Sequence, residues 1–475
     1  MTTTHRTGPV HLGSDPGEGS EVAVIGAGVS GLVAARQLAT TGARVTVFEA
    51  ADHVGGQLRA ATLAGQRVDV GAESVFTAAP GPLQLLEELG LGEELVGANR
   101  ATTWIWTERG LRPLPDGFTP AGPSRLGPVL RSRVLSPVGL LRAGLEPLLP
   151  ASRGGEDVAV GEELARRFGT EVVDRLVDPL LGGLHAGDVR TLSLQAATPQ
   201  LAALTAKHRS LLLRRRPTPS TGPAFVTLTS GMGTMTERLA TSSAGVEVRL
   251  GTRISAVTRE AGRLRLSVDG QRPIDVDGVV VATSAAVARE LLSEGSPVAA
   301  ATLGQLRAAS VVVAALAYPA RAAELPAIAG GTGILVPSTS PQLLKAATFL
   351  STKWPHHAHS DHVLIRASAG RAGDDRAIEL DDEPLIERLH GELAQATGLD
   401  VDPLEVTVQR WPRTMPQLEV GHHERLATIR SALARDLPGV VVAGAPYHGP
   451  GLSSCLRSAT GAATTLTTAL QEAHA

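Results

Sequence analysis

The chain has little of several residue types, and each shortage excludes a class of protein. Cys455 is the only cysteine among 475 residues, so no disulfide can form within the chain, which favours a reducing cytoplasm. No apolar run reaches the roughly 18 residues that a membrane-spanning helix needs. The formal net charge is −3, so the basic surface typical of nucleic-acid-binding proteins is not expected.

Other shortages concern the N-terminus and lysine. Residues 1–20 are polar and lack the apolar core of a signal peptide, so we expect a disordered tail. Lys207, Lys345 and Lys353 are the only lysines, and arginine supplies most of the positive charge.

Residues 21–49 carry a dinucleotide-binding pattern. An apolar, β-branched run predicts a buried parallel strand that leads directly into Gly26-x-Gly28-x-x-Gly31. An alanine-rich helix follows, and a second predicted strand ends at Glu49. Strand, glycine motif, helix and acidic residue in this order are the signature of a nucleotide-binding βαβ unit.

Each residue of this pattern has a physical task. Gly26 allows the tight turn, Gly28 lets the backbone approach a pyrophosphate, and Gly31 lets the helix pack on the strand. The helix N-terminus favours the phosphates because its N–H groups are unpaired and its dipole is positive there. Glu49 is placed to bind the ribose hydroxyls.

The sequence after Glu49 favours FAD over NAD. The pair Gly55-Gly56 followed by Arg59 is an extension seen in the flavin-dependent amine oxidase superfamily. Arg59 either faces the diphosphate or lies in solvent. Because no second glycine motif follows a strand, we expect an oxidase, or a dehydrogenase reoxidised by another acceptor, rather than an NAD(P)H-fed reductase.

The remaining sequence predicts an α/β fold in three units. Strands near both ends of the chain are expected to join the nucleotide-binding sheet, and strands between residues 305 and 415 predict a second, largely antiparallel sheet. We therefore expect an FAD-binding Rossmann-like domain (21–80, 225–300 and 420–475), an α+β substrate domain (81–119 and 301–419) and a helical insertion (120–224).

Four further segments are much more specific than the glycine motif. They read RLVDPLLGGLHAGD at 175–188, KAATFLSTKWPH at 345–356, QRWPRTMPQLEVGH at 409–422 and AGAPYHGPGLSSCLRS at 443–458. With these segments the chain resembles the bacterial protoporphyrinogen and coproporphyrinogen oxidases of haem synthesis, from about residue 21 to residue 463. The resemblance implies FAD-dependent removal of six hydrogens from a porphyrinogen in two-electron steps, with O2 as acceptor.

The resemblance also implies which residues hold FAD. They lie in the glycine motif, its Gly-Gly extension, the VDVGAES segment at 68–74, two later strands and the loop before the last helix. The implied residues are Gly26, Gly28, Ser30, Gly31, Glu49, Gly55, Gly56, Gln57, Arg59, Gly71, Ala72, Glu73, Ser74, Val248, Ala282, Gly444, Gly451 and Leu452.

The substrate class calls for cations. The high-GC Gram-positive branch of the family acts on coproporphyrinogen III, which carries four propionates, whereas protoporphyrinogen IX carries two. Arginine suits carboxylates because its fork can bind both oxygens, although each arginine also fits a structural or surface ion pair. The candidates in the substrate segments are Lys353 with Trp354, Arg366, Arg371 and Arg410.

We expect no nucleophile–base triad, because the cofactor carries the chemistry. Tyr447 and His448 precede the last helix and are candidates near the flavin, with simple packing as the other interpretation. The chain departs from the family at Ala78 and Ala79, where arginine is frequent, at His448, where an acid is usual, and at Pro450. These departures leave the substrate-carboxylate contacts and the flavin-edge chemistry open.

Other functions and partners stay open at this point. The alternatives are a protoporphyrinogen IX oxidase, another amine-oxidase-superfamily enzyme, or an inactive FAD-binding relative. Few aromatic residues are present (3%) for the aromatic cage of an amine oxidase. The arginine-rich stretches 125–142 and 209–216 fit a weak contact with an anionic membrane surface. Transfer of the poorly soluble product to a downstream haem-pathway enzyme is a further expectation, and the sequence does not give the oligomeric state.

Two remaining features are given structural interpretations. His356, His357, His359 and His362 lie in a polar stretch and are expected to form a solvated loop without a metal. Cys455 is expected to be a buried, inert thiol rather than a redox partner.

Overall fold

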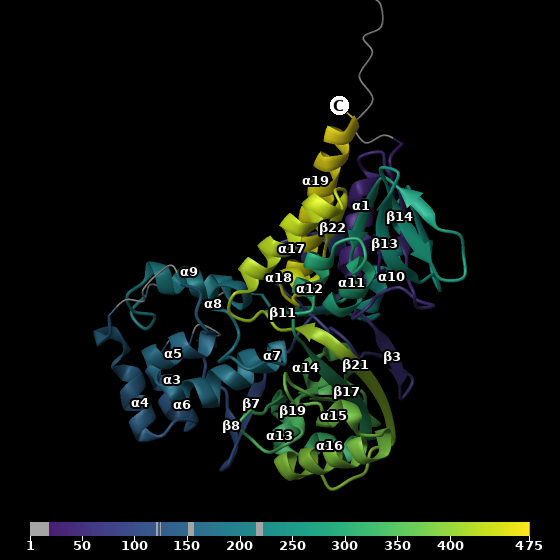
Figure 1. The fold of residues 1–475 in the computed structure, drawn as a ribbon. Coiled ribbons are helices and arrows are strands. Elements are labelled where there is room, and N and C mark those ends of the chain that lie inside the picture. Colours follow the sequence, from purple (N-terminus) through teal and green to yellow (C-terminus); the bar gives the residue numbers. More distant parts are fainter. Residues whose placement is uncertain (1–18, 120–121, 124, 151–155, 215–221, 475) are drawn as a thin grey trace, which may run out of the picture.

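The computed structural model describes residues 19–119, 122–123, 125–150, 156–214 and 222–474. Figure 1 shows an upper unit that holds both terminal segments, a lower unit built on a long curved sheet, and a helical unit to one side. Most of the predicted tail lies outside the described residues. Ser20, its last residue, is buried, and its carbonyl accepts a hydrogen bond of 2.9 Å from the Arg44 N–H.

The sheet of the upper unit is parallel and five-stranded. Its spatial order is β12 (Val246–Arg249), β2 (Arg44–Phe48), β1 (Glu21–Ile25), β16 (Gly278–Val281) and β22 (Val440–Val442). Valine and alanine fill both faces, as expected of parallel strands that are covered on both sides. The predicted α/β class is confirmed, and strands from the start, middle and end of the chain meet in this sheet.

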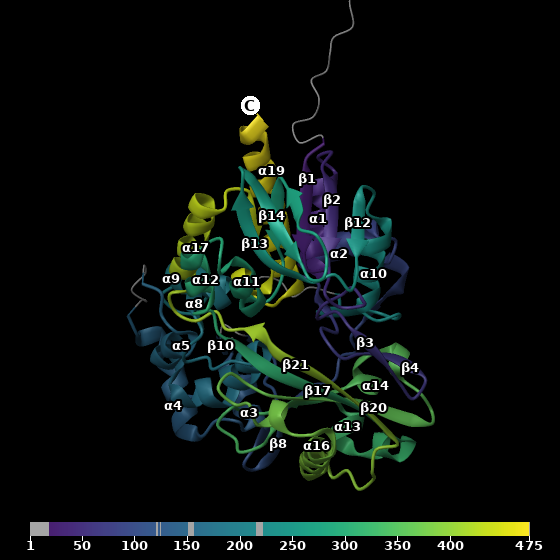
Figure 2. The same ribbon diagram turned by 45° about the vertical axis from the view of Figure 1, so that its right-hand side comes forward.

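Two layers cover this sheet (Figure 2). One face packs against α1 (Val29–Ala39), α10 (Gly233–Ser242) and the long C-terminal α19 (Leu452–His474). The other face packs against α11 (Ala285–Leu292), α12 (Pro297–Leu303), α17 (His422–Asp436) and a three-stranded antiparallel sheet of β13 (Ile254–Glu260), β14 (Arg263–Val268) and β15 (Ile274–Val276).

Residues 81–97 differ from the prediction. We assigned them to the substrate domain, but Leu85, Leu86 and Leu91 pack in the core of the upper unit together with α1 and α19. The helix in this region is short: α2 covers Pro82–Glu88, Gly90 takes a φ of 73°, and a 3-10 turn η1 (Gly92–Glu94) follows. A small sheet of β5 (Val75–Phe76), β11 (Phe225–Leu228) and β6 (Leu95–Gly97) closes this region.

The lower unit is built on seven strands. Their order is β21 (Glu405–Pro416), β17 (Ala308–Pro319), β20 (His362–Ala369), β19 (Leu344–Phe349), β18 (Gly331–Leu335), β7 (Thr102–Thr107) and β8 (Gly110–Pro113). Only the β18–β7 pair is parallel among these neighbours, so the predicted antiparallel character is confirmed.

The two faces of this sheet have different partners. One face is covered by η4 (Ala320–Glu324), α13 (Pro326–Ala329), α15 (Arg376–Glu379) and α16 (Asp382–Thr397). The other face packs against the hairpin of β3 (Ala60–Leu63) and β4 (Gln66–Asp69) from the upper unit. Between β19 and β20 lie α14 (Leu350–Lys353) and η5 (Pro355–His357). The upper and lower units therefore meet across one face of the lower sheet.

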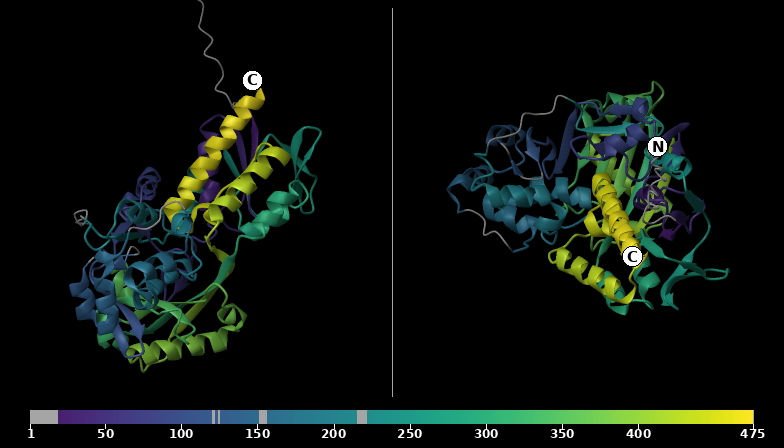
Figure 3. Two further views of the ribbon diagram at one scale, coloured as in Figure 1. Left: turned by 60° about the vertical axis from the view of Figure 1, so that its left-hand side comes forward. Right: turned by 90° about the horizontal axis from the view of Figure 1, so that it is seen from above.

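The helical unit projects sideways (Figure 3). It consists of β9 (Phe118–Thr119), β10 (Gly122–Pro123), α3 (Leu126–Ser132), α4 (Pro137–Gly144), η2 (Glu146–Leu148), α5 (Val160–Phe168), α6 (Thr170–Val172), η3 (Val173–Gly182), α7 (Gly183–His185), α8 (Leu194–Ala197) and α9 (Pro199–Lys207). The short helix α6 passes directly into the π-helix η3 at Val173. Pro179 lies inside it and cannot donate to a regular α-helical ladder. Within the described residues no helix is both long and apolar enough to cross a bilayer.

Candidate functional site

The turn from β1 into α1 is fixed by close packing. Gly26 has a φ of 106°, and a Cβ on it would lie 2.8 Å from the Ala282 carbonyl oxygen. A Cβ on Gly31 would lie 1.9 Å from the Gly26 oxygen. Both positions therefore admit only glycine, because the obstructing atoms belong to the backbone. Ala282, at the end of β16, is part of the same turn through its N–H bond of 2.8 Å to Ile25 O.

Gly28 has a different environment. The nearest neighbour of a Cβ built there is Gly56 Cα, at 4.0 Å. Gly28 and Gly55 form an isolated bridge, and Gly56 has a φ of 56°. Gly28 is also the N-cap of α1, and no side chain caps this helix, so its first amides remain available to a phosphate. This glycine-lined approach to a bare helix N-terminus fits a dinucleotide diphosphate.

The Glu49 carboxylate is held in position by backbone amides. It accepts the Ala27 N–H at 2.8 Å and the Ala51 N–H at 2.9 Å. Each oxygen keeps a second acceptor position, so the carboxylate can still accept a ribose hydroxyl. Val248, on the neighbouring β12, is aligned with Val47 just before this point, and Arg59 is exposed.

The C-terminal loop approaches the same turn. Ser30 donates to the Cys455 carbonyl at 3.3 Å, and the Gly444 N–H donates to Ser458 Oγ at 2.9 Å. A Cβ on Gly444 would lie 3.8 Å from Ser30 Oγ. Gly451 is exposed and leads into α19 at Leu452. The structure therefore brings the start of α1 and the start of α19 together.

Tyr447 and His448 lie in α18 (Ala445–His448), but they have different surroundings. Tyr447 is 2% exposed in the hydrophobic core between the parallel sheet and α17, and burial raises the pKa of its phenol. His448 Nδ1 lies 2.9 Å from Ser458 Oγ, and burial and nearby Arg430 lower its pKa. The ring of Tyr447 is packed in the core, its buried hydroxyl has no hydrogen-bond partner among the described residues, and its place near the flavin stays a prediction.

The segment after β4 is tied to the lower sheet by ions. Glu73 accepts from the Lys353 ammonium, and from Arg366 Nη1 at 2.5 Å. Arg366 Nη2 also donates to Gly71 O at 2.5 Å. Burial acts to raise the pKa of Glu73, but the two cations prevail and lower it to about 2. These three side chains bind one another across the two units, and their predicted contacts with cofactor and substrate stay predictions.

The rest of this segment is tightly built. A Cβ on Gly71 would lie 1.9 Å from Gln57 O, which accepts the Ala72 N–H at 2.9 Å. Gln57 Nε2 donates to Thr414 O at 3.1 Å, near the end of β21. Ser74 is half-buried beside Glu73. The Gly-Gly extension thus connects the glycine motif to the lower sheet.

The remaining substrate candidates, Trp354 and Arg410, lie in different places. Trp354 is 1% exposed and packs under the Lys353 ammonium, 4.8 Å from its ring centroid, so it is a core residue. Arg410 lies on the opposite face of the lower sheet, where it pairs with Asp382 and donates to Leu380 O at 2.5 Å. Its predicted contact with substrate beside Lys353 and Arg366 is wrong, because alternate residues of a strand face opposite sides.

A polar cluster that the sequence analysis did not assemble lies where the π-helix meets the lower sheet. Asp178 accepts from Ser338 N–H at 2.6 Å and Ser338 Oγ at 2.9 Å. His185 is 5% exposed, and burial lowers its pKa to about 4. Lys345, on β19, is also 5% exposed. A lysine inside an otherwise apolar strand, in a chain with three lysines, was the available signal.

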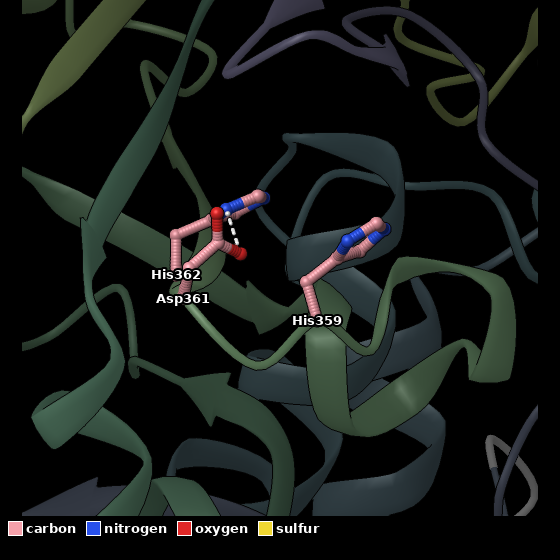
Figure 4. A group of neighbouring side chains, drawn as sticks. All are labelled: His359, Asp361 and His362. Atoms are coloured by element: carbon pink, nitrogen blue, oxygen red, sulfur yellow. Dashed lines mark ion pairs between the residues drawn. The ribbon is translucent and has the colours of Figure 1, made fainter.

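The histidine loop and the thiol lie away from this cluster. In Figure 4 His359 and Asp361 lie near His362, and the possible ligand atoms of the three are within 4.8 Å of one another. His359 and Asp361 are exposed, while buried His362 contacts Asp361 at 2.9 Å. The absence of a metal stays a prediction. Cys455 is buried, and burial raises its pKa to about 11, as expected of an inert thiol.

The chain is similar to known proteins along nearly its whole length. The family model of the flavin containing amine oxidoreductases matches residues 29–467. The coproporphyrinogen III oxidase of Bacillus subtilis (strain 168) is 31% identical over 92% of this chain and 95% of that protein. The coproporphyrinogen III oxidase of Mycobacterium tuberculosis (strain ATCC 25618 / H37Rv) is 33% identical over 94% and 97%.

One solved structure is also close. The crystal structure named "Putative protoporphyrinogen oxidase" from Exiguobacterium sp. 255-15 superposes with a TM-score of 0.86. Its sequence is 30% identical, and the match covers 94% of this chain and 99% of that one.

We predict that Gly28→Val gives a folded protein without FAD. A Cβ at this position meets no protein atom closer than 4.0 Å. The valine side chain would occupy the approach to the α1 N-terminus that the diphosphate needs. Circular dichroism should be unchanged while flavin absorbance after reconstitution falls to background. Gly461→Ala, in open space on α19, is the control and should keep FAD. Normal flavin content in Gly28→Val contradicts the assignment.

We predict that Glu73→Gln destabilises the protein in a pH-dependent way. At about pH 7 it leaves two part-buried cations without their carboxylate, which costs about 1–3 kcal/mol. Because the pKa of Glu73 falls from 4.5 to about 2, its contribution is present above 4.5 and is lost as pH falls toward 2. The difference in Tm between wild type and variant should shrink over that interval. A difference that is constant from neutral to acid pH contradicts the ion pairs.

Proposed function

The chain belongs to the flavin-containing amine oxidoreductase family, and within it we propose that the protein oxidises coproporphyrinogen III to coproporphyrin III with bound FAD. The observation that carries the proposal is the near full-length similarity to coproporphyrinogen III oxidases at 31–33% identity. The glycine-lined turn, the bare α1 N-terminus and Glu49 are the local support for the cofactor.

The chain's own residues bind and orient the two reactants. The first amides of α1 and the open backbone at Gly28 would hold the diphosphate, and Glu49 would hold the ribose. The α19 N-terminus would stabilise negative charge at the flavin ring. When bound, FAD supplies two-electron oxidation, and three such steps remove the six hydrogens while O2 is reduced to peroxide. We infer that the substrate binds beside the 71–74 segment and the facing strands of the lower sheet.

The helical unit carries a surface suited to a membrane interface. Its exposed apolar side chains are Leu130, Val138, Leu141, Leu145 and Leu148. Arg125, Arg131 and Arg133 are exposed beside them, whereas Glu146 of the same segment is buried. Apolar side chains beside arginine favour an anionic bilayer surface. We propose a weak peripheral contact here, through which poorly soluble porphyrinogens arrive and product passes to the next haem-pathway enzyme.

One other substrate has specific support. The solved relative from Exiguobacterium carries the name of a protoporphyrinogen oxidase, so protoporphyrinogen IX is the second candidate. The two substrates differ in carboxylate number, four against two, and this difference allows a direct test.

We predict that the FAD-loaded enzyme turns over coproporphyrinogen III at least about tenfold more efficiently (kcat/KM) than protoporphyrinogen IX, a difference of about 1.4 kcal/mol. Porphyrin fluorescence gives the rate in air, and peroxide should accumulate at three equivalents per porphyrin. The reverse preference would make the protein a protoporphyrinogen oxidase. FAD-loaded protein that is inactive on both would indicate an inactive relative.

We predict that the full-length enzyme co-sediments with vesicles containing phosphatidylglycerol, and less with pure phosphatidylcholine. The double variant Leu141→Asp, Leu148→Asp should lose most of this binding, because both side chains are exposed and would carry negative charge. Leu404→Asp, equally exposed on the lower unit, is the matched control. Equal sedimentation of both variants contradicts the proposed surface.

A further inference from the structure

Lys345 is a buried cation without a local counter-ion. Its side chain is 5% exposed, and within the described residues it makes no hydrogen bond or ion pair. Among the residues that the structure describes, the charges that act on it are those of Arg371 and Arg366, both positive. Together with burial they lower its pKa to about 7. A buried, unpaired ammonium is costly to a fold, so its presence needs an explanation.

Lys345 lies at an irregularity of its β-strand. β19 pairs with β20 with a register shift between Leu344 and Ala346, so Lys345 is the extra residue of a β-bulge. Leu344 and Ala347 pack in the core under α16, whereas Arg366 on β20 points toward the upper unit. Bulges commonly redirect a side chain beside a functional site.

The two neighbouring arginines, Arg366 and Arg371, differ in how many protein partners their guanidinium groups have. Arg366 binds Glu73 and Gly71, and it also lies near Asp69. Arg371 donates Nη2 to Val336 O at 2.6 Å and feels the charges of Asp178 and Asp374, but its buried Nη1 has no partner. Val336 itself donates its N–H to the Lys345 carbonyl at 3.1 Å. The ammonium of Lys345 and the Nη1 of Arg371 therefore both lack a partner among the described residues, and the Arg371 charge is close enough to act on Lys345.

We propose that Lys345, assisted by Arg371 Nη1, binds a carboxylate of the substrate, namely one propionate of the porphyrinogen. This inference rests on the proposed function and adds to it a specificity-determining residue that is distinct from Lys353 and Arg366. The carboxylate completes a donor set that the protein leaves unfilled, through charge-assisted hydrogen bonds. Lys353 differs from Lys345 because its ammonium already pairs with a carboxylate of the protein, Glu73.

The test uses Lys345→Met in the FAD-loaded full chain. The variant should raise KM for coproporphyrinogen III and weaken binding of coproporphyrin III at least about tenfold, the loss expected for a charged hydrogen bond. The kcat should change less than about threefold, because a contact that holds the substrate equally in the ground state and the transition state affects KM and not kcat. Its Tm should stay equal or rise, because an unpaired buried charge is removed.

Two control variants accompany this test. Lys345→Arg should keep most of the affinity, and Lys207→Met, at an exposed lysine on α9, is the matched control.

A second ligand separates binding from mere structure. Coproporphyrin III tetramethyl ester has no free carboxylate, so wild type and Lys345→Met should bind it alike while differing for the free acid. Equal weakening for acid and ester, or an unchanged KM, overturns the role of Lys345. If wild type neither oxidises coproporphyrinogen III nor binds coproporphyrin III, the proposed function itself fails and this inference fails with it.

Discussion

The buried Glu73 carboxylate is the contact on which the arrangement of the two sheets depends. It comes from the segment after β4, whereas its partners Lys353 and Arg366 come from α14 and β20 of the lower unit. Because Glu73 is buried, the ions have no strong competition from water, and removal of one would leave a charge in a low-dielectric region. Gly71 lies on this segment, and its neighbour Ala72 donates to Gln57 O of the cofactor extension at 2.9 Å, so the ion pairs also set how that extension faces the lower sheet.

The nucleotide-binding half was predictable because its determinants are local. The strand, the glycine motif, the helix and Glu49 follow within 29 residues, and the spacing itself encodes the turn. The structure shows that the three glycines of the motif have different roles. Gly26 and Gly31 are required by the protein's own backbone, while Gly28 has open space beside it. Only the second kind of glycine leaves room for a ligand.

The substrate half was less predictable because its contacts are distant in sequence. The Glu73 pairs span 280 and 293 residues, and no spacing rule links such positions. Arg410 was misplaced because its face depends on strand parity, which the register shift between Ala309 and Val311 on β17 makes hard to infer from sequence. The π-helix cannot be inferred from sequence, because the spacing of its apolar residues is compatible with an ordinary α-helix. The contact of its Asp178 with Ser338 joins residues 160 positions apart.

The cations of the lower sheet differ in whether a carboxylate of the protein pairs with them. Lys353 and Arg366 share the carboxylate of Glu73 within the protein, so they stabilise the contact between the two units. Lys345 has no such partner among the described residues, and the charges that act on it repel it. Lys345 sits on a bulge, whereas Arg366 lies in regular pairing with Thr348. A fold keeps an unfavourable charge at an irregular position where a ligand supplies the missing partner, so the site for an anionic substrate is best sought beside the uncompensated lysine rather than the paired one.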